Sequence, residues 1–87
     1  MVGQRVTAMT NHVFALVYTN RATRKITFLG SFPTREKAQA KMQEELAEYA
    51  HDSTWRVEQG SPNSARVFDR YDGNEYWHGT FEILKHY

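Results

Sequence analysis

The sequence feature that most constrains the fold is the aromatic-rich segment from Phe68 to Tyr87. These 20 residues hold six of the chain's 12 aromatic residues, and they surround the turn-forming sequence Asp72-Gly73-Asn74. An Asp-Gly step between two runs of apolar and aromatic residues is typical of a β-hairpin. The segment therefore predicts two antiparallel strands, and both faces of this hairpin carry aromatic residues.

The last strand of this hairpin has two different faces. Alternation of side chains places Trp77, Phe81 and Ile83 together, and we expect these three residues to pack beneath a helix, with His78 on the opposite face. The stretch from Tyr76 to Ile83 contains neither proline nor lysine. If it forms an edge of the sheet, nothing in it therefore prevents pairing with a strand of another chain. We therefore expect that a homodimer could form by pairing of the last strand with its copy.

The remaining elements follow from periodicity and from one helix cap. The predicted elements are strands at 12–19 and 25–32, a helix at 35–50, and strands at 55–59, 65–71 and 75–84. Both faces of the first strand are apolar, which is typical of a central strand. Thr34 is the predicted N-cap of the helix, and residues 60–64 form a predicted loop. The helix stripe expected to be buried consists of Ala38, Met42, Leu46, Tyr49 and Ala50.

This order of elements predicts an α+β domain, in which one antiparallel sheet of about five strands (ββαβββ) carries one helix on one face. A chain of 87 residues is long enough for one core only. We expect residues 1–8 to form a flexible leader and residues 9–87 to form the domain. The absence of cysteine and of an apolar N-terminal segment favours a cytoplasmic protein.

No arrangement of residues in the sequence indicates catalysis. The four histidines, at 12, 51, 78 and 86, show no metal-binding spacing. No serine lies in a nucleophile elbow, and the glycine-serine segment before the helix lacks the lysine of a phosphate-binding loop. We therefore expect a protein that is not an enzyme and that has no metal and no cofactor.

The predicted hairpin instead offers a surface for a partner. Tyrosine and arginine dominate the binding energy of many protein interfaces. Candidate partner-binding residues are Arg66, Phe68, Arg70, Tyr71 and Tyr76. The first hypothesis is thus a non-catalytic protein-binding module.

The alternative hypothesis is a small protein that binds RNA or single-stranded DNA. Residues 1–35 carry a net charge of +5, whereas residues 36–87 carry −4. Aromatic side chains on a sheet can stack on bases, and basic residues nearby can contact phosphates. The candidate nucleic-acid contacts are Arg21, Arg24 and Lys25.

A resemblance to a known group of proteins rests on three segments, VFALVYTN, KITFLGSFPTREKAQAKMQEEL and ARVFDRYDGNEYWHGTFEI. Together they resemble small phage and prophage proteins with a strand–strand–helix start and an aromatic last strand, a group that includes anti-CRISPR inhibitors. This resemblance implies a protein that inhibits without catalysis, by occupying a surface of a host CRISPR effector complex. A net charge of +1 departs from the acidic DNA mimics among these inhibitors. This charge favours binding to the guide RNA, or to an effector surface other than the arginines that read the target DNA.

Overall fold

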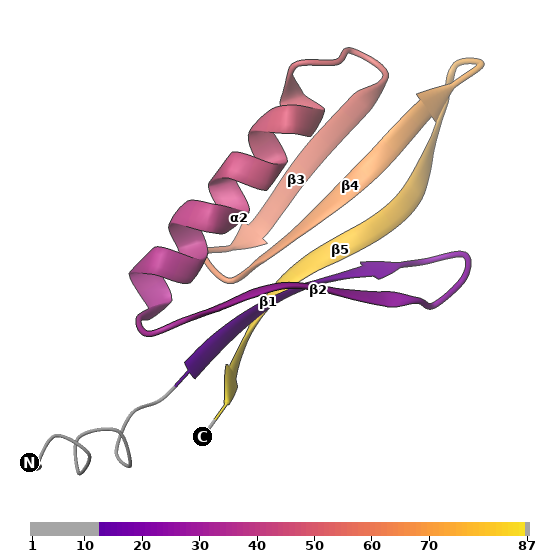
Figure 1. The fold of residues 1–87 in the computed structure, drawn as a ribbon. Coiled ribbons are helices and arrows are strands. Elements are labelled where there is room, and N and C mark those ends of the chain that lie inside the picture. Colours follow the sequence, from indigo (N-terminus) through magenta and orange to yellow (C-terminus); the bar gives the residue numbers. More distant parts are fainter. Residues whose placement is uncertain (1–12, 87) are drawn as a thin grey trace, which may run out of the picture.

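The computed structural model describes residues 13–86 and shows an α+β fold with a single five-stranded antiparallel sheet and one helix (Figure 1). The elements are β1 (Val13–Asn20), β2 (Ile26–Phe32), α2 (Arg35–Ala50), β3 (Trp55–Ser61), β4 (Ser64–Tyr71) and β5 (Asn74–His86). The predicted fold class and the order ββαβββ are therefore confirmed. The predicted leader at residues 1–8 lies outside the described residues. Within residues 13–86, the helix is too short and too polar to cross a lipid bilayer.

The strands lie in the order β2-β1-β5-β4-β3, so β5 is the central strand of the sheet. The prediction that the last strand could lie at the edge is wrong. At 13 residues, β5 is long enough to pair with β4 from Asn74 to Glu82 and with β1 from Gly79 to His86. The two edges are formed by β2 and β3. The prediction that the first strand is not an edge strand is confirmed, since β1 lies between β2 and β5.

The helix begins as the sequence predicts. Thr34 is extended, and its hydroxyl accepts a hydrogen bond from the backbone N–H of Lys37 at 3.2 Å. Such a cap satisfies one of the N–H groups that the first turn leaves without a partner. Of the predicted stripe, Ala38, Met42 and Leu46 are buried and Tyr49 is half-buried, but Ala50 is exposed at the last helical position.

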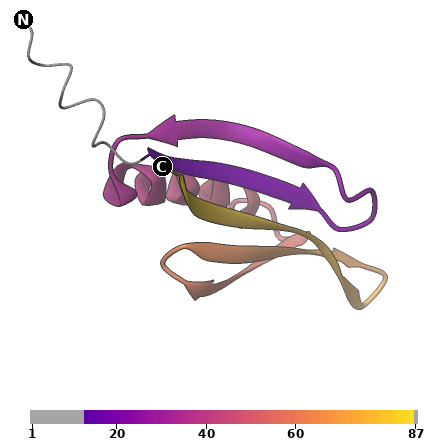
Figure 2. The same cartoon turned by 90° about the horizontal axis from the view of Figure 1, so that it is seen from below.

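Figures 1 and 2 show α2 covering one face of the sheet, and the core residues lie between them. The sheet contributes Leu16, Val67 and Phe81, which meet Met42 of the helix with almost no exposed surface. Burial of a side chain of this size contributes roughly 1.5–3 kcal/mol to folding. The core cluster is Leu16, Ala38, Met42, Leu46, Ala65, Val67, Phe81 and Ile83.

Two tight turns join the last three strands. Asp72 and Gly73 both have positive φ, 56° and 80°, which is the conformation of the two-residue hairpin turn that the Asp-Gly step predicts. The other turn is shorter than predicted. Strand β3 continues to Ser61 and β4 begins at Ser64, so the predicted loop at residues 60–64 reduces to a turn of two residues, Pro62 and Asn63.

Candidate functional site

The face of the sheet opposite α2 has no element of residues 13–86 covering it, and we call it the open face. Alternation along each strand fixes its residues. Leu16 and Ile83 are paired and lie in the core, so the next pair, Val17 and Glu82, points to the open face. A sheet with a helix on one side only leaves its second face available for other contacts.

One half of the open face is apolar. Phe28 is paired with Val17, Ile26 with Thr19, and Leu84 with Ala15, so these side chains share this face. Ile26 and Phe28 are each 63% exposed and Leu84 is 48% exposed, which is unusual for side chains of their size. Sequence reasoning did not single out these three residues. The available signal was the alternation of Ile26 and Phe28 in the second strand.

The other half of the open face is built around Trp77, which the sequence placed beneath the helix. That prediction is wrong because β5 contains a β-bulge. Val67 pairs with Gly79, but the next residue, Phe68, pairs with Trp77, which leaves His78 as an additional residue in β5. One extra residue reverses the alternation. Trp77 therefore lies on the open face, 39% exposed, and its indole N–H donates to Gly79 O at 3.2 Å and to Thr80 Oγ1 at 3.1 Å.

The same bulge moves His78 to the helix side, opposite to its predicted face. The His78 ring lies 5.0 Å from that of Trp55, edge to face, and its Nδ1 is 2.5 Å from the Tyr18 hydroxyl. Burial raises the pKa of Tyr18 well above its ordinary value, and the neighbouring Tyr49 adds to this effect. These groups are enclosed by aromatic neighbours, and they belong to the packing beneath the helix rather than to an exposed site.

A chain of alternating charges crosses the open face from β3 to β5. Arg56 Nε lies 2.8 Å from Glu75 Oε1, and Arg70 Nε lies 3.2 Å from Glu75 Oε2. The hydrogen bond from Arg56 holds the pKa of Glu75 below its ordinary value, and Arg70 adds to the effect. Glu58 then joins Arg56 to Arg66, at 3.7 and 3.9 Å. The three arginines of this half are thus balanced in part by two carboxylates.

The structure divides the five predicted partner-binding residues between two faces. Arg66, Phe68 and Arg70 alternate along β4 and lie on the open face, where Arg56 covers the half-buried ring of Phe68 at 4.3 Å. Tyr71 and Tyr76 point to the opposite face of the sheet, which is the face on which α2 lies. They are 70% and 52% exposed, so they form a separate surface near the end of the β4–β5 hairpin.

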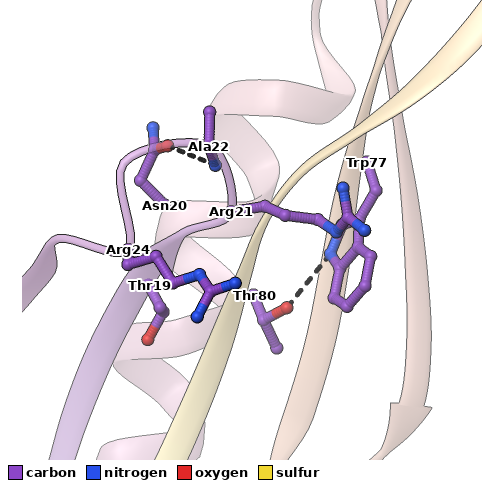
Figure 3. A pocket seen from close by; sticks show the side chains of 7 residues that line it. All are labelled: Thr19, Asn20, Arg21, Ala22, Arg24, Trp77 and Thr80. Carbon is purple, nitrogen blue, oxygen red and sulfur yellow. Dashed lines mark hydrogen bonds between the residues drawn. The ribbon is translucent and has the colours of Figure 1, made fainter.

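The candidate nucleic-acid contacts Arg21, Arg24 and Lys25 lie in the loop between β1 and β2. Arg21 contacts Trp77 at the rim of the open face, and Arg24 lines the same pocket (Figure 3). The guanidinium carbon of Arg21 lies 4.6 Å from the centroid of the Trp77 ring, and that of Arg66 lies 5.0 Å from it. A pocket of about 540 Å³ is lined by Thr19, Asn20, Arg21, Ala22, Arg24, Trp77 and Thr80.

Within residues 13–86, no group of three or more histidine and carboxylate side chains is gathered closely enough to hold a metal ion. A scan against protein-family models, a search of curated proteins and a search of solved structures each found no match to the chain. The residues of the open face are thus the basis for the function proposed for this protein.

Proposed function

We propose that this protein is a non-catalytic protein-binding module and that the open face of the sheet is its binding surface. The observation that carries this proposal is the exposure of Ile26, Phe28 and Leu84 on the face that α2 leaves uncovered. Neighbouring apolar side chains of this size on an exposed face are typical of an interaction site. Their burial by a partner supplies the apolar centre of an interface.

The aromatic half of the open face supports the same proposal. Tryptophan and arginine are enriched among the residues that dominate binding energy, and here Trp77 stands between Arg21 and Arg66. These contacts hold the indole in place before binding, so less conformational entropy is lost when a partner covers it. The charge chain from Arg70 to Arg66 then forms a polar rim on one side of the apolar centre.

A host CRISPR effector complex is the partner that the resemblance to small phage proteins implies, and it is the first partner to test. The test compares two positions that carry a photo-crosslinking amino acid, Phe28 on the open face and Ala40 on the exposed side of α2. Purified effector complex is mixed with each protein and irradiated. We expect an adduct from position 28 and none from position 40. Equal adducts from both positions refute the open face as the binding surface.

Affinity measurements then test the apolar contribution with any partner so identified. Phe28→Ser removes an exposed ring, so we expect the stability to change little, by about 0.5 kcal/mol. Loss of its burial in a complex weakens binding by roughly 1.5–3 kcal/mol, which is about tenfold or more. The matched control is Ala40→Ser, which leaves affinity unchanged. Unchanged affinity of the Phe28→Ser variant contradicts the proposal.

A protein that binds RNA or single-stranded DNA is the second candidate. The observation in its favour is that Arg21, Arg24 and Lys25 form no ion pair with a carboxylate within residues 13–86. This candidate requires an affinity for an oligonucleotide that falls steeply with salt concentration and that is lost in an Arg24→Gln, Lys25→Gln variant. Absence of a mobility shift at low salt removes it.

A further inference from the structure

The cations of the pocket beside Trp77 have no carboxylate partner within residues 13–86. The loop that carries these cations is held by its own hydrogen bonds. The side-chain oxygen of Asn20 accepts from the N–H groups of Ala22 and Thr23, both at 3.0 Å. The backbone N–H of Arg21 donates to His78 O at 2.9 Å, which ties the loop to the bulge in β5. The pocket is therefore pre-organised.

Two arginines contribute their charge to this pocket. The Arg21 guanidinium lies over the Trp77 ring, and this cation–π contact leaves its N–H groups available as donors. Arg24 adopts a left-handed conformation, φ 63°, and its side chain runs towards Thr80 (Figure 3). Its backbone N–H donates to Asn20 O at 2.8 Å, which keeps the turn closed. Both arginines line the same pocket.

The other arginines of the open face differ from Arg21 and Arg24 in having acidic partners. Arg56, Arg66 and Arg70 each have a carboxylate of this chain within ion-pair distance. Arg21 and Arg24 have no such carboxylate in the part of the chain that the structure describes. A guanidinium fork matches a carboxylate with two parallel hydrogen bonds. The missing carboxylate is therefore one that a partner can provide.

We infer that the pocket formed by Arg21, Arg24 and Trp77 binds a glutamate or aspartate side chain of an acidic, extended segment of the protein partner. This inference rests on the proposed function and specifies the chemistry of the partner. Ile26 lies next to this pocket, because its pair in β1 is Thr19, one of the pocket residues. The segment thus combines a carboxylate over the pocket with an apolar side chain over Ile26 and Phe28.

The rest of the open face favours a protein carboxylate over a nucleic-acid phosphate. A phosphate backbone needs a continuous basic path, but Glu82 lies on the same face of β5 as Thr80, two residues away. Glu58 and Glu75 lie farther along the sheet, beside the remaining arginines. The Trp77 ring is also covered by Arg21 and Arg66, so it is not free for a base to stack on. One carboxylate meets two cations here, and none of these three acids lines the pocket.

Nuclear magnetic resonance provides the test, since the indole N–H of Trp77 reports on the pocket and that of Trp55, on the helix side, serves as an internal control. The probe is an acetylated five-residue peptide with glutamate at its second position, valine at its fourth and serine elsewhere, so that both side chains point to the same side of an extended chain. The control peptide carries glutamine instead of glutamate. We expect the glutamate peptide to shift the Trp77 signal in a saturable way and to leave the Trp55 signal in place. The glutamine peptide shifts neither signal.

Two matched variants locate the effect. The Arg21→Gln, Arg24→Gln variant weakens binding of the glutamate peptide by about tenfold or more, since it removes both charge-assisted contacts. The Lys37→Gln, Lys41→Gln variant also removes two positive charges, from α2, and keeps the affinity. Equal weakening by the two variants contradicts a specific site. No saturable shift of the Trp77 signal at millimolar peptide overturns the inference.

Three further outcomes would assign the pocket to another ligand or to none. Tighter binding of a six-nucleotide oligothymidylate than of the glutamate peptide replaces the inference with nucleic-acid binding. Self-association in sedimentation experiments that the Arg21→Gln, Arg24→Gln variant abolishes assigns the pocket to a second copy of the chain instead. If Phe28→Ser weakens binding to a partner but the arginine variant does not, the inferred carboxylate site is wrong and the proposed function stands.

Discussion

Gly79 offers a sharp test of the packing between β1 and β5. It pairs with Asn20 and Val67, and it lies directly beneath the side chain of Tyr18. A Cβ atom at this position would overlap the Tyr18 hydroxyl and ring, and it would lie 2.7 Å from the carbonyl oxygen of Thr19. The backbone oxygen has little freedom to move. We therefore expect Gly79→Ala to displace Tyr18 from its place beside Phe81.

The cost of this displacement has two parts. Overpacking of a filled site costs about 1–3 kcal/mol. Loss of the hydrogen bond between Tyr18 and His78, 2.5 Å long in the native protein, adds about 1 kcal/mol. The sum is about 3 kcal/mol, which in a domain of this size corresponds to a melting temperature lower by roughly 12–24 °C. Such a loss is a large part of the stability expected for a small domain.

Urea unfolding followed by circular dichroism measures this change, and Gly60→Ala is the matched control. A Cβ at Gly60 meets no heavy atom within 4 Å, so its substitution changes the free energy of unfolding by about 0.5 kcal/mol or less. The decisive experiment repeats Gly79→Ala in a Tyr18→Leu background, where at least about 1 kcal/mol of the cost disappears. If Gly79→Ala costs the same in both backgrounds, the clash with Tyr18 is not the cause.

Three further predictions concern pH and the helix cap. The raised pKa of Tyr18 means that the folded state holds this proton more tightly, so stability is full below pH 10.0, the ordinary value, and is lost as the pH rises above it. Tyr18→Phe flattens this alkaline loss in pH-dependent urea titrations. The lowered pKa of Glu75 has the opposite sign, because the stability that it contributes at neutral pH is lost as the pH falls below 4.5. Glu75→Gln reduces that acid slope, and an unchanged slope contradicts the role of Arg56. Thr34→Ala removes the helix cap and lowers the free energy of unfolding by about 1 kcal/mol, measured by thermal melting. Ser53→Ala is its control, since Ser53 is exposed and its hydroxyl makes no hydrogen bond in the part of the chain that the structure describes.

Local signals in the sequence predicted most of the fold. The Asp72-Gly73 turn and the Thr34 cap depend on backbone conformation and on hydrogen bonds within a few residues, so the residue types alone reveal them. The two apolar faces of β1 likewise indicated a strand with neighbours on both sides. Of the site, the sequence placed Arg66, Phe68, Arg70, Tyr71 and Tyr76 together on one hairpin, and the structure puts the first three on the open face. Alternation within each strand already separates Tyr71 from Arg70, but the sequence does not say which face of the hairpin a helix covers.

The sequence by itself thus determined the elements, their order and the α+β class, because these follow from periodicity, capping and turn chemistry. Only the tertiary structure decided that β5 is the central strand, because strand order depends on contacts between residues far apart in the chain. It also decided the position of Trp77. A single bulge at His78 reverses the alternation of β5, and no period-two pattern reveals one extra residue. That reversal brings Trp77 to Arg21, and so forms the pocket on the open face.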